Sequence, residues 1–220
     1  MSCTGATAVF VVETEAGPAA LIIIGAILFL VAMVGRQIKE ISLTEGIFTP
    51  EELKEVLRNT QTPEDVLTIA SAASTAAPEI QSDPEVQHLT AAAYEQILAK
   101  NLTEIFGQEA VQAITGPYDL GIDILVSLGG KKAGIQTKFG RTDMHFTDRR
   151  MREAVQWVLR GSPDADAVII VSNMHEPSLS ILGAARDRAQ ASGKTFQYVR
   201  WNPDGDTTQL ERVIRDHLGA

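Results

Sequence analysis

Three side chains near the middle of the chain have the types and spacing of a metal-dependent hydrolytic site. Asp123 lies in the otherwise apolar run 122–128, where a carboxylate costs free energy unless it is paired or bound to a metal. Gln136 and Lys138 are two residues apart in the next run, so strand alternation points both to one sheet face. The Gly-Gly pair at 129–130 predicts a hairpin turn that brings them opposite Asp123. A carboxylate, an amide oxygen and an ammonium group suit a hard divalent cation with an activated water.

These residues resemble the active-site hairpin of the PD-(D/E)xK, or restriction-endonuclease-like, superfamily, and most closely its Mrr-type branch. That branch carries Gly-(Ile/Val)-Asp on one strand and Gln-x-Lys on the next. The matching residues here are Gly-Ile-Asp at 121–123 and Gln-Thr-Lys at 136–138. The family also places a glutamate on the helix before the hairpin, where this chain has Glu95. The resemblance extends over about residues 88–202.

The resemblance implies an α/β fold of the restriction-endonuclease-like type, a mixed sheet flanked by helices. It implies that Asp123 is the main ligand of Mg²⁺ or Mn²⁺ and that Gln136 takes the place of the more usual acid. Glu95 would bind the metal directly or through water, and Lys138 would orient the attacking water. The implied activity is endonucleolytic hydrolysis of DNA, in defence against foreign DNA. Because two strands must be cut, a homodimer is expected, and because host DNA must be spared, regulation by a partner protein or by oligomerisation is expected.

Two departures from the family pattern leave alternatives open. Tyr118-Asp119 stands where the family name leads one to expect Pro-Asp, which leaves Asp123 as the acid. Gln136 in place of a glutamate removes one negative charge, so the domain could instead be a catalytically silent module that binds nucleic acid or a protein at the membrane. A third reading is a membrane sensor or effector in which the apolar span itself does the damage.

The charge is unevenly distributed along the chain. The net charge is −9, yet residues 1–110 hold 5 basic against 15 acidic side chains and residues 111–220 hold 14 against 13. The whole-chain charge therefore misleads about nucleic-acid binding, because the second half is locally basic around the hairpin. The candidate phosphate contacts are Lys131, Lys132, Arg141, Arg149 and Arg150. An ordinary solvated face explains them equally well.

Residues 17–35 form a stretch of 19 residues without a charged side chain. A helix of that length spans roughly 28 Å, which matches a bilayer core of about 30 Å. Glu13 and Glu15 precede the stretch, while Arg36 and Lys39 follow it. The positive-inside rule then predicts a single-pass protein of the inner membrane with its folded part on the cytoplasmic side. A buried core helix and a signal peptide are the alternatives, and the absence of Lys and Arg from residues 1–16 disfavours the latter.

The expected organisation is an extracytoplasmic segment 1–16, a membrane span 17–35, a helical connector 36–83 and a nuclease-like domain 84–220. In the connector, Thr49 and Thr62 are each followed directly by a proline and, three positions after the threonine, by an acidic residue. This pattern predicts two helices with capped N-termini. The Ala-rich stretch 70–77 is interpreted as a tether. In the domain, the pattern predicts a helix from Pro84 to Phe106 and then the order β-β-α-β-α-β-α. His145 and His175, far apart in sequence, are interpreted as surface or loop histidines.

Overall fold

The computed structural model describes residues 49–76, 78–114, 121–141 and 144–219, and the structural statements below concern these residues. The chain divides into two units, with the boundary between Thr90 and Ala91. This boundary falls inside helix α5 (Pro84–Phe106) and not at residue 83, where the sequence suggested one. Helix α5 itself has the bounds that the sequence predicts. Each unit is described separately.

The first unit contains α3 (Pro50–Asn59), α4 (Pro63–Ala76), the 3₁₀ helix η1 (Pro78–Ser82) and the start of α5. Both predicted caps are present. The Thr49 hydroxyl accepts a hydrogen bond from the Glu52 backbone N–H at 3.3 Å, and the Glu52 carboxylate accepts one from the Thr49 N–H at 2.9 Å. The Thr62 hydroxyl accepts the Asp65 N–H at 3.2 Å in the same way. Capping satisfies backbone donors that the first turn of a helix leaves unpaired, so these short motifs fix where α3 and α4 begin.

The interpretation of residues 70–77 as a tether is wrong. Helix α4 continues through this stretch to Ala76, and Ala70 and Ala73 are each only 4% exposed. Alanine has the highest helix propensity of all residues, and its small side chain lets helices pack closely. An Ala-rich segment without Gly or Pro therefore extends the helix that precedes it.

The second unit is an α/β domain built on a five-stranded mixed sheet with strand order β1-β2-β3-β4-β5. Strands β1, β2 and β3 pair antiparallel, and β3, β4 and β5 pair parallel. The strands are β1 (Val111–Ala113), β2 (Ile124–Leu128), β3 (Lys131–Lys138), β4 (Ala167–Ser172) and β5 (Thr195–Arg200). The helices after the hairpin are α6 (Asp148–Gly161), α7 (Leu179–Ala191) and α8 (Thr208–Leu218). The predicted mixed sheet flanked by helices is thus confirmed.

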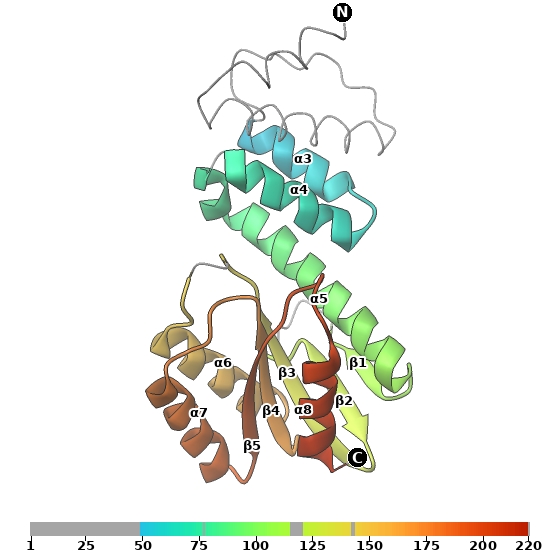
Figure 1. The fold of residues 1–220 in the computed structure, drawn as a ribbon, viewed down its shortest axis with the longest axis vertical. Coiled ribbons are helices and arrows are strands. Elements are labelled where there is room, and N and C mark those ends of the chain that lie inside the picture. Colours follow the sequence, from blue (N-terminus) through green and yellow to red (C-terminus); the bar gives the residue numbers. More distant parts are fainter. Residues whose placement is uncertain (1–48, 77, 115–120, 142–143, 220) are drawn as a thin grey trace, which may run out of the picture. The chain divides into compact units, whose positions relative to one another are not determined.

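Helices cover both faces of this sheet (Figure 1). On one face, α6 and α7 pack through Met151, Val155 and Ala189 against side chains of β4 and β5. On the other face lie α8 and the part of α5 that belongs to this unit. All six residues of β4 are buried, as expected for a central parallel strand that is covered on both sides. Strand β3 lies beside β4, and its end forms the candidate site.

The remaining differences from the sequence prediction are local. Strand β1 was not expected, because it is only three residues long and two of them are exposed. Strand β2 begins at Ile124, so Asp123 lies just before the strand and not within it. No helix among the described residues is long and apolar enough to cross a membrane. The predicted span 17–35 lies outside the described residues.

Gly121 should be indispensable to this fold. Its φ is +75°, and a Cβ atom there would lie 2.4 Å from the Trp157 Cβ and 2.8 Å from the Trp157 carbonyl carbon of α6. We expect Gly121→Ala to lower the free energy of unfolding by about 2–4 kcal/mol, through backbone strain and overpacking. Urea unfolding followed by the fluorescence of Trp157 and Trp201 measures this, since both tryptophans of the chain lie in the second unit.

Gly183→Ala is the matched control. Gly183 lies in α7, and a Cβ there would have nothing within 4 Å. Alanine at this helical position should stabilise the protein by about 0.5–1 kcal/mol. Equal effects of the two substitutions would contradict the close approach of Gly121 to α6.

Candidate active site

The candidate site exists because β2 and β3 differ in length. At the carboxyl end of β3, the last residue paired with β2 is Ile135, which lies opposite Ile124. Strand β3 then continues for three residues without a β2 partner. The other edge of these residues remains paired with β4, where Gln136 is opposite Ile170. The N–H of Asp123 still donates to the Ile135 carbonyl oxygen at 2.9 Å. The Asp123 side chain therefore begins at the place where backbone pairing stops.

The Asp123 carboxylate accepts the hydrogen bonds from β3 that a longer β2 would have accepted. Its Oδ2 accepts the backbone N–H of Thr137 and, at 2.7 Å, the Thr137 hydroxyl. The Gln136 side chain donates through Nε2 to both carboxylate oxygens, at 3.0 and 2.9 Å. This agrees with the predicted hairpin, in which Gln136 faces Asp123 across the two strands. A buried backbone N–H must find an acceptor, and here an acidic side chain supplies it.

Glu95 reaches the same group of residues from α5. The Thr137 hydroxyl lies 3.1 Å from Glu95 Oε1 while it also lies 2.7 Å from Asp123 Oδ2. A hydroxyl has a single proton, so it cannot satisfy both carboxylates fully. Two carboxylates on one hydroxyl repel each other unless a proton or a cation lies nearby.

Tyr94 fixes the helix that carries Glu95. It is fully buried, its hydroxyl donates to the Trp201 carbonyl oxygen at 2.8 Å, and its ring lies 5.1 Å from the ring of Phe139. Burial raises the pKa of Tyr94 well above its ordinary value, so the hydroxyl keeps its proton and remains a donor. Adjacent residues on a helix point in different directions, so burying Tyr94 sets the direction of Glu95.

Burial raises the pKa of Asp123 above its ordinary value, because desolvation disfavours the charged form. Hydrogen bonds from the side chain and the backbone of Thr137, and the positive charge of Lys138, act in the opposite direction without cancelling the effect. Lys138 is therefore close enough to stabilise negative charge on Asp123, as its position on β3 predicts. A bound cation would act in the same sense.

The donor set fits a divalent cation of the Mg²⁺ or Mn²⁺ type. It consists of the carboxylates of Asp123 and Glu95 and the side-chain amide of Gln136. Hard cations prefer such oxygen ligands. Rotation of the Gln136 amide by half a turn would put its oxygen where its nitrogen now lies. Within the described residues, no group of three or more His, Cys, Asp or Glu side chains is placed to hold a metal.

The lysines of the hairpin tip do not adjoin this site. Lys131 and Lys138 are the two ends of β3, and seven residues of strand correspond to about 23 Å. Lys132 pairs with the carboxylate of Asp164. A role for Lys131 and Lys132 in binding nucleic acid stays a prediction, at a place remote from Asp123.

The predicted arginines lie closer to the carboxyl end of β3. Arg141 is exposed in the segment after β3. Arg149 pairs with Glu153 at 2.8 Å in the first turns of α6, and the Arg150 guanidinium lies 3.5 Å from the Met174 sulfur. Their contact with nucleic acid also stays a prediction. Tyr118 and Asp119 lie outside the described residues.

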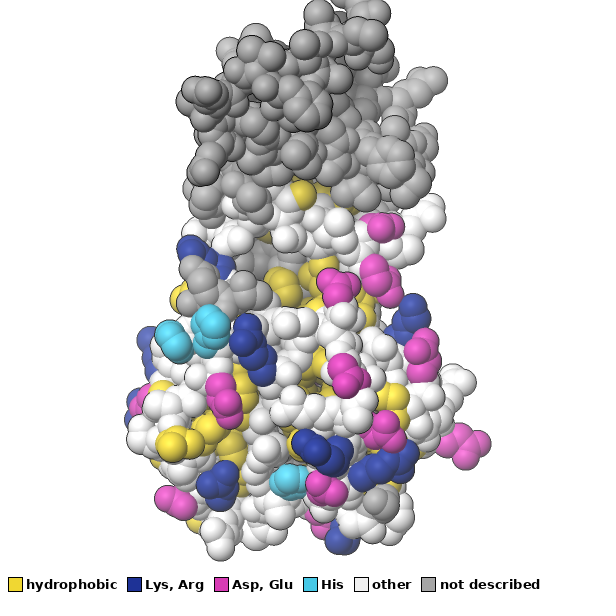
Figure 2. Space-filling model, in the orientation of Figure 1, with side chains coloured by type: hydrophobic (Ala, Val, Ile, Leu, Met, Phe, Trp, Pro, Cys, Tyr) yellow, Lys and Arg dark blue, Asp and Glu magenta, His cyan; other side chains and the backbone are white. Residues whose placement is uncertain are grey.

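Two features of this region were missed from the sequence. The motif assigns no role to the Thr137 side chain, which lies between Gln136 and Lys138, although its hydroxyl contacts both carboxylates. Its signal was the hydroxyl itself, a polar group in a strand that is otherwise buried. His145 and His175 are brought together, with ring centroids 5.3 Å apart and a parallel bridge between their backbones. Figure 2 shows two histidine side chains side by side, on a face where acidic and basic groups are interspersed.

The comparisons with known proteins do not assign the chain to a family. No protein-family model matches it, and no curated protein matches it.

The pKa of Asp123 leads to a test of the site by stability. Because the folded state raises this pKa, it holds the proton more tightly than the unfolded chain, and stability falls as pH rises through the pKa. The amide of Asp123→Asn does not titrate, but its NH₂ group cannot accept the hydrogen bonds that the carboxylate accepts. We therefore expect the Tm of this variant, relative to that of the wild type, to rise between a pH of about 3.9 and pH 7. Below a pH of about 3.9 the difference in Tm should no longer change with pH, because Asp is protonated even when unfolded.

Thermal unfolding of both proteins across this pH range, in the presence of a chelator, measures the effect. Asp206→Asn is the control, because Asp206 is an exposed carboxylate whose pKa is lowered by its hydrogen bonds with Thr208. Its substitution should lower the Tm at pH 7. A difference in Tm between Asp123→Asn and the wild type that falls as pH rises would contradict the raised pKa of Asp123.

Proposed function

We propose that the chain is a metal-dependent endonuclease that hydrolyses DNA phosphodiester bonds. The observation that carries this proposal is the convergence of Glu95, Asp123 and Gln136 on the end of β3 that has no β2 partner, with Lys138 on the same strand. The mixed sheet flanked by helices and the order of its elements agree with the restriction-endonuclease-like fold that the hairpin motif suggests.

Each side chain has a separate task in this proposal. Asp123 and Glu95 supply negative oxygens next to the Thr137 hydroxyl. Gln136 would supply a neutral oxygen after its amide rotates by half a turn, because its Nε2 now faces Asp123. A divalent cation held there would polarise a phosphoryl oxygen and lower the pKa of a water molecule. Lys138 contributes a positive charge that orients water and stabilises negative charge on the phosphate in the transition state. No side chain is needed as a covalent nucleophile.

Cleavage assays with the full chain, purified in detergent because of the apolar stretch 17–35, test the proposal. Supercoiled plasmid should be cut in Mg²⁺ or Mn²⁺ and not in EDTA. Asp123→Asn should be folded and inactive, and Lys138→Ala should lose about 10²–10³-fold in rate, as expected for loss of one charge-stabilising group. A labelled RNA in the same assay establishes which nucleic acid is cut.

Arg212→Ala is the control for loss of a positive charge, because Arg212 is exposed on α8. It should cut at the wild-type rate. Cutting by Asp123→Asn at the wild-type rate would refute this site. Absence of cutting by the wild type in any metal would leave the silent binding module as the reading to pursue.

One observation favours that second candidate. Gln136 donates hydrogen bonds to both oxygens of Asp123, and Thr137 donates two more to one of them. The carboxylate is therefore satisfied without a metal. An acid in place of Gln136 could not donate in this way, so the amide allows the cluster to persist in the absence of a cation. A domain that binds but does not cut would need no more than this.

The substitution Gln136→Glu separates the two candidates. If the cluster binds metal, a third carboxylate should tighten Mg²⁺ binding about tenfold or more, because each added charge strengthens coordination by a hard cation. The Tm of this variant should lie below that of the wild type in EDTA and should rise more steeply with added Mg²⁺. A Tm that ignores Mg²⁺ in both proteins would contradict a metal site.

We further propose that residues 17–35 anchor the nuclease in the inner membrane, with the domain on the cytoplasmic side. The length and apolarity of this stretch support the anchor, and the charges on its flanks support the orientation. Foreign DNA that enters the cell would be met at the membrane. A nuclease that cuts both strands of a duplex would act as a homodimer, and a nuclease at the membrane would need a partner or an oligomeric state that restrains it from host DNA.

A further inference from the structure

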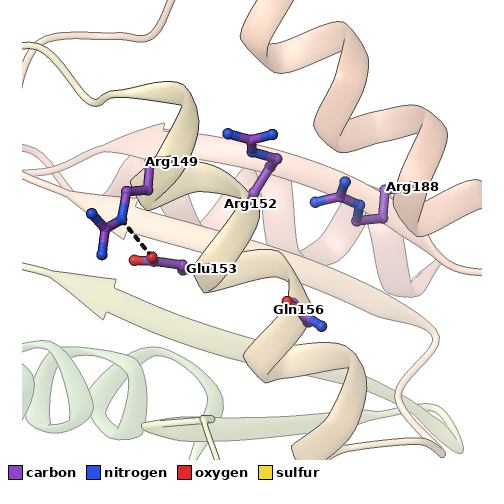
Figure 3. A pocket seen from close by; sticks show the side chains of 5 residues that line it. All are labelled: Arg149, Arg152, Glu153, Gln156 and Arg188. Carbon is purple, nitrogen blue, oxygen red and sulfur yellow. Dashed lines mark hydrogen bonds and ion pairs between the residues drawn. The ribbon is translucent and has the colours of Figure 1, made fainter.

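A second concentration of polar groups lies outside the candidate active site, between α6 and α7. A hollow of about 430 Å³ there is lined by Arg149, Arg152, Glu153, Gln156 and Arg188. This volume is within the range of roughly 300–1,000 Å³ that is typical of small-ligand pockets. Four of the lining residues lie on one face of α6, and the fifth, Arg188, comes from α7 (Figure 3). The hollow is thus built by two helices that the fold places side by side.

The positive charge of this hollow is only partly compensated. Arg149 pairs with Glu153 at 2.8 Å and Arg152 pairs with Asp148 at 3.0 Å, both along α6 itself. Among the residues that the structure describes, Arg188 has neither an ion pair nor a hydrogen bond of its side chain. Figure 3 shows Arg188 extending from α7 toward α6, on the side where Arg152 lies. Three guanidinium groups therefore face one hollow with two carboxylates to balance them.

This gathering of arginines is not a by-product of a basic composition. Residues 111–220, which contain α6 and α7, hold 14 basic against 13 acidic side chains, so an average region of this half would be close to neutral. Like charges that share a hollow repel each other, and an anion between them relieves the repulsion. The guanidinium group is planar, presents parallel N–H donors and matches the oxygens of a phosphate in a bidentate arrangement. The two ion pairs on α6 engage one face of Arg149 and of Arg152 and leave further donors on each.

We propose that the hollow between α6 and α7 binds phosphate groups through Arg149, Arg152 and Arg188. The phosphates come either from a nucleic-acid backbone or from a free phosphorylated ligand, and the two sources share this chemistry. None of the residues that line the hollow belongs to the cleavage site proposed at Asp123, and binding there does not require cutting. The hollow is therefore a phosphate-binding site in its own right, whether or not the domain is a nuclease.

Binding measured in EDTA, so that no substrate is cut, tests the proposal with the full chain in detergent. The probes are a short fluorescein-labelled DNA duplex, followed by anisotropy, and sodium tripolyphosphate, followed by calorimetry. Arg188→Gln should bind at least one probe about tenfold more weakly than the wild type. With the duplex, its plot of log K against log salt should be flatter by about one unit, the value for one lost phosphate contact. Arg188→Lys should recover part of the affinity, because it keeps the charge and loses the planar fork.

Arg186→Gln is the matched control, with the same change of charge on the same helix at an exposed residue that does not line the hollow. Loss of duplex affinity in Arg188→Gln alone supports a nucleic-acid backbone as the source of the phosphates. Loss confined to tripolyphosphate supports a free phosphorylated ligand. Equal affinities of the two variants for both probes would overturn the proposal. Cleavage of plasmid in Mg²⁺ by the same Arg188→Gln preparation, measured beside its binding in EDTA, distinguishes failure at the cleavage site from failure at the hollow.

Discussion

The structure of the candidate site depends on the unequal length of two paired strands. Strand β3 runs three residues beyond the last residue with a β2 partner, and the Asp123 side chain occupies the vacant edge. Had β2 continued, a backbone carbonyl would accept the Thr137 N–H and the carboxylate would have no place in the sheet. The desolvation of Asp123, its contact with Gln136 and the approach of Glu95 all follow from this interruption of the ladder. The cost of burying an acid is met because that acid supplies the acceptor that the backbone lacks.

The residues just before Asp123 maintain this interruption of the β2–β3 pairing. Gly121 has a positive φ and lies against the backbone of α6 at Trp157, at a distance that leaves no room for a side chain. This tight turn directs Ile122 into the core between the sheet and α6, where it is 5% exposed. Asp123 then lies at the edge of the sheet. Each residue of the Gly-Ile-Asp motif therefore has a separate structural role in this chain. Gly121 forms the turn, Ile122 packs into the core, and Asp123 places its carboxylate at the edge of the sheet.

Much of this arrangement could be predicted from the sequence, and the reason is local. The Gly-Gly turn fixes the register of β2 with β3, and register places Gln136 opposite Asp123. The apolar run of β4 and the caps of α3 and α4 are likewise encoded in a few adjacent residues. What escaped prediction depends on contacts between distant segments. The role of Thr137 requires α5 to lie over the sheet, and the pairing of His145 with His175 requires β3 and β4 to be neighbours. The helical continuation of α4 differs from the prediction for another reason: a high alanine content alone does not distinguish a linker from a helix.

The segments that follow β3 and β4 are fastened to each other as well as to the sheet. The side chain of Asn173 exchanges two hydrogen bonds with the backbone of Gly140, at 2.9 and 2.6 Å, and the Ser172 hydroxyl donates to the Lys138 carbonyl oxygen at 2.6 Å. These links join residues 33 and 34 positions apart. Closing such a loop costs entropy before any contact repays it. During synthesis, the end of β3 therefore lacks these hydrogen bonds until Asn173 has left the ribosome. A truncated chain that ends before β4 contains every residue of the cluster but not the segment that holds the cluster in place.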